Sequence, residues 1–149
     1  MAATIKAPSG TLEVRRTFNA PRQRVYDAWT KAEEMKKWVG PGPMTATVAE
    51  SDVRVGGKYR IAMRNPNGTE HRAHGVYRVV DPPKKVVYTW TWETMPDVVD
   101  TVVTVEFLEK GNSTEVVLRH DGLTADQKKP HEDGWIGCFD KFAKVVTGT

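Results

Sequence analysis

The sequence predicts an α+β fold in which a strongly curved antiparallel β-sheet wraps around a long C-terminal α-helix, with two short helices after the first strand. Between residues 44 and 121, apolar and polar side chains alternate in segments that short turns separate, which is typical of an antiparallel meander. Residues 130–146 instead repeat apolar side chains at helical spacing. Such a sheet and helix must bury their apolar faces against each other, so we expect one core between them.

The first strand is expected at residues 11–19. Leu12, Val14 and Phe18 alternate with polar residues over this segment, as in a half-buried strand. The same alternation puts Arg16 on the apolar face. We therefore expect this guanidinium to point toward the core.

Start and stop signals predict the two short helices. Pro21 suits the first position of a helix, and apolar residues follow it at helical spacing. Thr30 and Glu33 are spaced as in a capping box, which predicts the start of a second helix. This helix is expected to stop at Gly40-Pro41, so that the two form a kinked pair.

Six further strands lie between clear turn signals, and we expect them at residues 45–50, 58–64, 70–80, 85–93, 101–110 and 114–120. The last helix, at residues 130–146, presents an apolar face made of Trp135, Cys138, Phe139, Phe142 and Val146.

Length and composition indicate one globular domain. The 149 residues suit a single core, with residues 1–10 expected as a flexible tail and residues 11–149 as the domain. Apolar residues make up 39% and charged residues 28%, which excludes a disordered chain. No apolar run approaches the roughly 20 residues that cross a membrane, and no secretory signal precedes the domain, so we expect a cytoplasmic protein without membrane contact.

The net charge of +3 is carried by scattered basic pairs. Without a basic stripe or a recognition motif, no nucleic-acid partner is expected. A single cysteine excludes an internal disulfide framework. The sequence does not indicate an oligomeric state.

Tyrosine and tryptophan side chains are directed by the strand alternation toward the space between sheet and last helix. Apolar rings with a few hydroxyl and indole donors are typical of small-molecule sites, although the pattern also fits a packed aromatic core. Inward polar side chains at Arg16, His71 and His120 favour a pocket, because buried polar groups need a partner or a ligand. The candidate ligand-binding residues are Arg16, Tyr59, Met63, Tyr77, Tyr88, Trp90, Trp92, His120, Trp135, Cys138, Phe139 and Phe142.

No metal, cofactor or catalytic group is predicted. His71 and His74 are an odd number of residues apart on a strand, so they point to opposite faces and cannot chelate one ion. His120 and His131 lack a third ligand, which favours a hydrogen-bonded core His120 and an exposed His131. Cys138 lies on the apolar helix face, where a thiol is usually an unactivated small hydrophobe.

Four segments resemble one superfamily: residues 16–21 (RTFNAP), 25–30 (VYDAWT), 52–60 (DVRVGGKYR) and 118–123 (LRHDGL). They are similar to the START-like, birch-pollen-allergen-like superfamily (SRPBCC), and more narrowly to the branch named after the activator of heat-shock-protein-90 ATPase. The resemblance implies the helix-grip fold, with a deep cavity between the sheet and the long helix.

Members of this superfamily include lipid and hormone carriers as well as polyketide cyclases and aromatases. The resemblance therefore implies a hydrophobic cavity that binds a small lipid-like or aromatic molecule. Two alternatives stay open: a cyclase-type or aromatase-type enzyme in which His120 or a tyrosine moves protons, and a chaperone-related interaction protein. The co-chaperone of this branch carries an additional N-terminal domain, for which we expect no room in this chain, so a chaperone partner has no support from the residues.

Overall fold

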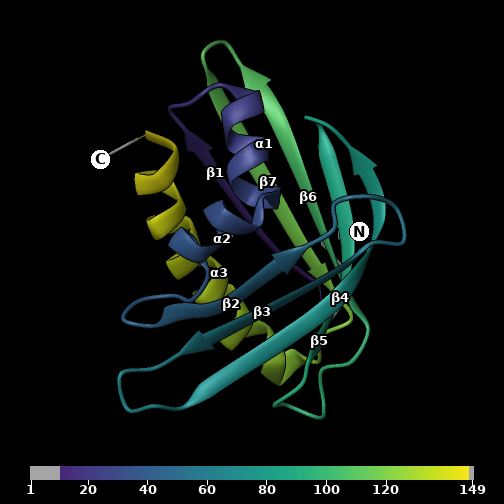
Figure 1. Ribbon diagram of the computed structural model, residues 1–149. Helices are drawn as coiled ribbons and strands as arrows, with labels where there is room; N and C mark the ends of the chain where they lie inside the picture. The colour runs from purple at the N-terminus through teal and green to yellow at the C-terminus, as the bar shows by residue number, and fades with distance from the viewer. Residues whose placement is uncertain (1–10, 148–149) are drawn as a thin grey trace, which may run out of the picture.

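Residues 11–147 are described by a computed structural model, in which a seven-stranded sheet curls around a long helix (Figure 1). In chain order, the elements are β1 (Leu12–Phe18), α1 (Arg22–Thr30), α2 (Ala32–Trp38), β2 (Thr45–Ser51), β3 (Lys58–Arg64), β4 (Glu70–Asp81), β5 (Lys85–Trp92), β6 (Thr101–Lys110), β7 (Ser113–Asp121) and α3 (Ala125–Thr147). Their type and order confirm the predicted α+β fold. The predicted N-terminal tail, residues 1–10, lies outside the described residues.

The sheet is antiparallel throughout, in the order β1-β7-β6-β5-β4-β3-β2. Strands β2 to β7 follow one another as the predicted meander. β1 forms the other edge by pairing with β7, from Leu12 opposite His120 to Phe18 opposite Thr114. This is the helix-grip layout.

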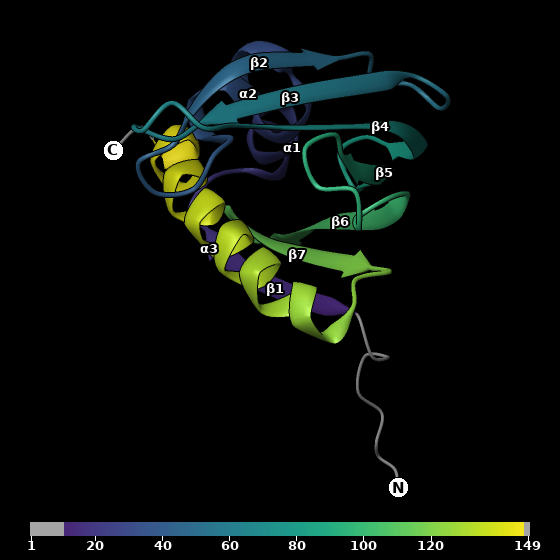
Figure 2. The same ribbon diagram turned by 90° about the horizontal axis from the view of Figure 1, so that it is seen from below.

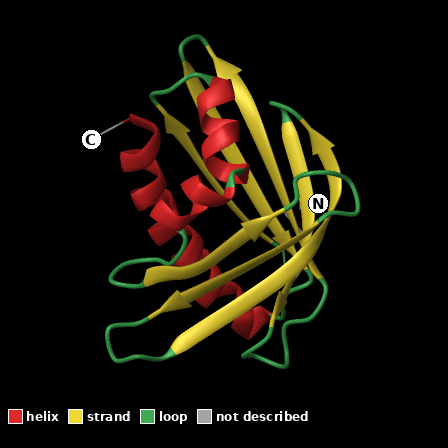
Figure 3. Cartoon of the chain, viewed as in Figure 1, coloured by secondary structure: helices red, strands yellow, loops and turns green. Residues whose placement is uncertain are grey.

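All three helices lie on the same side of the curved sheet (Figure 3). In Figure 2 the sheet has two arms, with β1 and β7 in one and β2 and β3 in the other, and α3 runs along the open side between them. α3 packs on β1, α1 and α2. The core therefore lies inside a half-barrel that α3 closes.

The junction between α1 and α2 differs from the predicted capping box. Lys31 is the N-cap of α2, its backbone is extended, and its side chain makes no capping bond. Thr30 belongs to α1, and its Oγ1 donates to the Tyr26 carbonyl at 2.9 Å. The helix pair is present, but the box of Thr30 with Glu33 is wrong because the chain turns one residue later.

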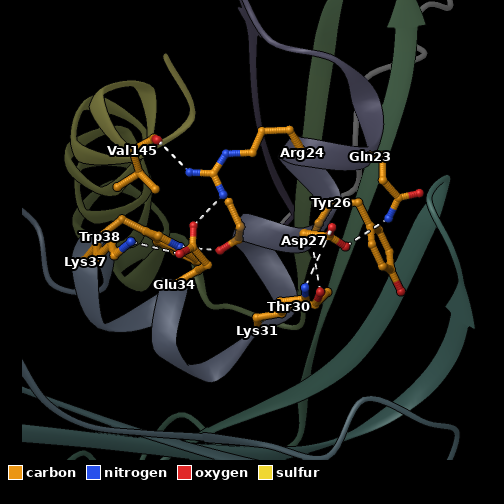
Figure 4. A network of polar contacts seen from close by, with 11 residues as sticks. Gln23, Arg24, Tyr26, Asp27, Thr30, Lys31, Glu34, Lys37, Trp38 and Val145 are labelled. Carbon is orange, nitrogen blue, oxygen red and sulfur yellow. Dashed lines mark hydrogen bonds and ion pairs between the residues drawn. The ribbon is translucent and has the colours of Figure 1, made fainter. Parts of the chain in front are cut away.

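A polar network ties the short helices to the end of α3 (Figure 4). Arg24 on α1 donates to Glu34 Oε1 on α2 at 2.6 Å and to the Val145 carbonyl at 2.9 Å. Lys37 Nζ donates to Glu34 Oε2 at 2.9 Å. One guanidinium thus holds three helices together.

A bulge in β4 changes one predicted face. The pairing with β5 shifts between Tyr77 and Val79, which leaves Val79 opposite Val87 and Val80 opposite Val86. Val79 is 39% exposed, whereas Val80 packs against the core. Strict alternation from the inward Tyr77 predicts that Val79 also points inward, and this prediction is wrong because the bulge reverses the alternation.

α3 begins at Ala125, earlier than the predicted residue 130. The backbone N–H of Thr124 donates to Gln127 Oε1 at 2.9 Å, and the Thr124 carbonyl accepts from the Lys128 N–H at 3.1 Å. These contacts start the helix before Pro130, which lies inside it. The extra turn places the Gln127 carbonyl where it accepts a hydrogen bond from His131.

Two glycines on α3 have different surroundings. A Cβ at Gly137 would lie 2.5 Å from the Cβ of Pro41, closer than real Cβ atoms approach. A Cβ at Gly134 would meet nothing within 4 Å. Gly137 therefore permits a close contact between α3 and the loop after α2, whereas Gly134 borders open space.

Alanine at these two positions should change stability in opposite directions. Gly134→Ala should raise the free energy of unfolding by about 0.5–1 kcal/mol, because alanine loses less backbone entropy than glycine in a helix. Gly137→Ala should lower it by about 1–3 kcal/mol, because the added methyl group overpacks the contact with Pro41. Urea denaturation measures both changes, and a shift of the same sign in both variants would contradict the contact.

Candidate functional site

Two hollows lie between the sheet and α3. The larger, which we call the cavity, has a volume of about 250 Å³, and the smaller, the inner void, about 30 Å³. The cavity is lined by Pro41, Met44, Met63, His71, Trp90, Trp92, Met95, Pro130, His131, Gly134, Trp135 and Cys138. The inner void is lined by Trp29, Met35, Trp38, Val39, Tyr59, Ile61, Met63, Tyr77, Tyr88, Trp90, Trp135 and Cys138.

Neighbouring strands and one face of α3 form the cavity wall. Met63 on β3 lies opposite His71 on β4, and Trp92 is on the adjacent strand β5. On α3, His131 and Trp135 are four residues apart and therefore share a face. The wall is thus built on regular elements.

Lys141 fixes the loop that contributes Pro41 and Met44 to the cavity. Its Nζ donates to the carbonyls of Gly40 and Met44, at 2.5 and 2.6 Å. Burial lowers the pKa of this amine. The position of α3 therefore also positions this part of the cavity wall.

Three predicted tyrosines line the inner void rather than the cavity. The ring of Tyr88 lies 5.1 Å from that of Tyr59 and 5.8 Å from that of Tyr77. Tyr59 Oη donates to the Thr89 carbonyl at 2.5 Å, and Tyr88 Oη accepts from Trp29 Nε1 at 3.2 Å. Burial raises the pKa of all three phenols, so they stay protonated at neutral pH. This part of the interior is a packed core.

Five of the predicted residues do line the cavity: Met63, Trp90, Trp92, Trp135 and Cys138. Burial raises the pKa of the Cys138 thiol to about 11, so the thiol is protonated at neutral pH. His71, which the strand alternation also directs inward, is a sixth member of the wall.

Arg16 does not point into the cavity. Its side chain is 41% exposed, and Nη1 donates to Asp140 Oδ1 on α3 at 2.6 Å. The inward role predicted for Arg16 is wrong because β1 is an edge strand, where a long side chain can pass beside the helix to solvent. Phe18 on the same strand instead packs edge-on against Phe139 and Phe142, with ring centroids 5.6 and 5.1 Å apart.

His120 is fully buried and hydrogen-bonded at both ring nitrogens. Its Nδ1 accepts from Trp135 Nε1 at 3.2 Å, and an indole can only donate, so the proton of the neutral ring is on Nε2. Nε2 donates to Thr101 Oγ1 at 2.8 Å, and that hydroxyl donates to the Trp90 carbonyl at 2.8 Å. Burial, with His131 nearby, lowers the pKa of His120 to about 3. The predicted hydrogen-bonded core histidine is confirmed.

His131 was expected to be exposed, and this is wrong. Its Nε2 accepts from Trp92 Nε1 at 2.9 Å, and its Nδ1 donates to the Gln127 carbonyl at 2.8 Å. Burial lowers its pKa as well. His131 lies one turn before Trp135 on the inner face, and the early start of α3 supplies the Gln127 carbonyl that accepts from it.

Two polar atoms of the cavity wall have no partner among residues 11–147. They are the indole Nε1 of Trp90 and the Nδ1 of His71, and both are buried. Within the same residues, no group of three or more His, Cys, Asp or Glu side chains is placed to hold a metal ion. None of the described helices has the length and hydropathy to cross a membrane.

Sequence reasoning missed six cavity residues. Three of them, Pro130, His131 and Gly134, could have been found by continuing the inner face of α3 backwards from Trp135. The other three come from loops or their edges, where no periodic pattern marks an inward side chain: Pro41, Met44 and Met95.

A family model described as "Activator of Hsp90 ATPase homolog 1-like protein" matches residues 19–147. The chain belongs to this family. The resemblance to the heat-shock-protein-90 ATPase activator branch, suggested by the four sequence segments, is thereby confirmed.

Within this family, the chain is 21% identical over 144 residues to the human protein named "Activator of 90 kDa heat shock protein ATPase homolog 1", and to its mouse counterpart. The match covers 97% of this chain and 39% of either relative. The chain therefore spans about two fifths of the length of the curated relatives it matches.

Solved structures share the family's architecture. A protein from Chromobacterium violaceum superposes with a TM-score of 0.85 at 24% identity, covering 92% of this chain and 96% of that one. A protein from Staphylococcus epidermidis gives 0.80 at 23% identity, covering 98% and 94%. These similarities establish the fold.

The buried histidine should make stability depend on pH. Above about pH 6.5, His120 is neutral in both the folded and the unfolded protein. As the pH falls below this value, His120 becomes protonated in the unfolded chain, whereas in the folded protein it stays neutral until about pH 3. The free energy of unfolding should therefore fall by up to about 1.4 kcal/mol per pH unit from this group below pH 6.

Urea denaturation between pH 7 and 5 measures this slope. His120→Gln is the matched variant, because an amide can accept from Trp135 and donate to Thr101 without titrating. Its slope should be shallower by the contribution of one proton. A slope equal to that of the parent protein would show that His120 does not cause the pH dependence.

Proposed function

We propose that the protein binds a small, largely apolar molecule, aromatic or lipid-like, in the cavity between the sheet and α3. The observation that carries this proposal is a cavity of about 250 Å³ whose wall holds three tryptophans and three methionines. Aromatic and apolar side chains with a few polar atoms are typical of ligand sites. We also propose that the protein is cytoplasmic, and the free thiol of Cys138 is compatible with that location.

The volume limits the size of the ligand. An apolar protein cavity of about 150 Å³ is large enough for benzene, and ligand pockets commonly start near about 300 Å³. The cavity lies between these values, which favours a molecule of one or two rings or a short chain. Flexible thioethers at Met44, Met63 and Met95 allow the wall to adapt to its occupant.

Binding is a better-supported proposal than turnover or chaperone contact. The cyclase or aromatase alternative assigned proton transfer to His120 or a tyrosine, but His120 has both nitrogens occupied, and neither it nor Tyr59, Tyr77 or Tyr88 lines the cavity. Binding to a chaperone would need a contiguous apolar patch on the protein surface. The most exposed apolar side chains are Val55, Val99 and Ile136, in the loop after β2, the loop after β5 and α3, and the cavity is the site with the more specific composition.

Indane, a bicyclic hydrocarbon, should bind saturably to this cavity. The expected signature is a shift of the methyl resonances of Met44, Met63 and Met95 in carbon-labelled protein during a titration followed by NMR. Gly134→Leu should weaken binding by at least about tenfold, because its side chain occupies the open space next to Gly134.

Gly134→Ala is the control for this change. It alters the same position and favours the helix, but it adds only a methyl group, so indane binding should be nearly unchanged. Shifts that fail to saturate, or a leucine variant that binds as well as the alanine variant, would exclude the cavity as the binding site.

A further inference from the structure

The five indole N–H groups differ in one respect. Four have an acceptor within the protein, and these are Trp29 with Tyr88 Oη, Trp38 with the Ala28 carbonyl, Trp92 with His131 Nε2, and Trp135 with His120 Nδ1. The Nε1 of Trp90 is buried and has no acceptor among residues 11–147. An indole nitrogen can only donate, so this group lacks an oxygen or nitrogen acceptor.

Trp90 lies where a ligand would meet it. The residue is only 5% exposed, on β5, and its ring is 5.2 Å from the rings of both Trp92 and Trp135. It lines the cavity and the inner void, and thus forms part of the boundary between them. Its neighbours enclose the donor atom in this structure, so an acceptor carried by a molecule in the cavity satisfies it once the adjacent flexible side chains, such as Met63, shift.

The composition of the wall favours an uncharged ligand. No Asp, Glu, Lys or Arg side chain is among the cavity-lining residues within the described chain, and both nitrogens of His131 are already bonded. A carboxylate would be desolvated there without a lysine or arginine beside it, which is costly. A carbonyl oxygen accepts the same hydrogen bond without that cost.

His71 marks the other end of the cavity. Ala73 pairs with Trp92, so His71 lies four residues along the sheet from the position opposite Trp90, a separation of about 13 Å between backbones. The unpartnered Nδ1 of His71 is therefore not a substitute acceptor for Trp90. It is available for a second polar group at the far end of a ligand.

We propose that the ligand of this cavity is an uncharged ring compound with an oxygen acceptor, of the ketone type, that receives the hydrogen bond of Trp90 Nε1. This inference rests on the proposed function, because it specifies the chemistry of a molecule in the same cavity. The apolar body of the ligand contacts the tryptophan and methionine side chains, and the oxygen fixes its orientation.

A matched pair of probes tests the proposal. Indane and 1-indanone share a bicyclic skeleton and differ by one carbonyl group. We expect 1-indanone to bind about tenfold more tightly, since it satisfies a buried donor that indane leaves unpaired. In a nitrogen–proton spectrum of the indoles, the ketone should move the Trp90 Nε1–H resonance downfield, and indane should not.

Trp90→Phe removes the donor and keeps an aromatic ring. In this variant the two probes should bind with equal affinity. Trp38→Phe is the control, because the indole of Trp38 donates to the Ala28 carbonyl and Trp38 is not among the cavity-lining residues, so this variant should keep the preference for the ketone. If Trp90→Phe does not fold, the proposal is still tested in the unmodified protein by the ratio of the affinities for 1-indanone and indane and by the response of the Trp90 Nε1–H resonance.

The outcomes separate the two proposals. If neither probe binds, the proposed function fails. If both bind equally and the Trp90 resonance responds alike to each, the ligand-binding proposal survives but the acceptor inference is overturned. That second result would be expected if a water molecule in the inner void, rather than a ligand, accepts from Trp90.

Discussion

The hydrogen bond between Trp135 on α3 and His120 on β7 links the long helix to the sheet inside the core. It joins two elements that a short connection separates in sequence, and it lies near the middle of α3. One to two turns further along the helix, Arg16 pairs with Asp140, and Phe18 packs against Phe139 and Phe142. α3 is thereby held against the arm formed by β1 and β7, and the space beside β3, β4 and β5 is left for the cavity.

The same contact controls proton positions in the core. Because Trp135 can only donate, one tautomer of His120 satisfies all groups of the network, and burial keeps that ring neutral. On the cavity side, Trp92 likewise donates to His131 Nε2, so the proton of the neutral His131 ring is on Nδ1, which donates to the Gln127 carbonyl. Two histidines that could in principle titrate are thus used as structural acceptors, and the one indole without such an acceptor is Trp90 among the described residues.

The type and order of the strands and helices could be predicted from the sequence, because they follow from the periodicity of its apolar residues. Alternation along β3 placed Tyr59 inward correctly, since a strand has only two faces. Alternation could not place Val79, where a bulge inserts a residue, nor Arg16, whose long side chain leaves the core at a sheet edge. Both depend on neighbouring strands, which one segment of sequence does not contain.

The division between filled and open space was harder to predict than the faces. Tyr59, Tyr77 and Tyr88 point inward as expected, but their rings fill the space around a void of about 30 Å³ because they pack against one another. Which rings meet depends on register and on rotamers, and periodicity specifies neither. The loop residues of the cavity, such as Met44 and Met95, have no period at all.

The residues that hold α3 against the sheet are largely distinct from the residues that line the cavity. Residues that hold α3 in place, such as His120, Gly137 and Lys141, differ from most of those that determine what the cavity accepts. The latter include Met95 in a loop and Trp92 at a strand end. Substitutions there can alter size and polarity of the cavity while the contacts between sheet and helix persist. A TM-score of 0.85 at 24% identity therefore shows a shared fold, whereas the size and polarity of this cavity depend on the side chains that line it.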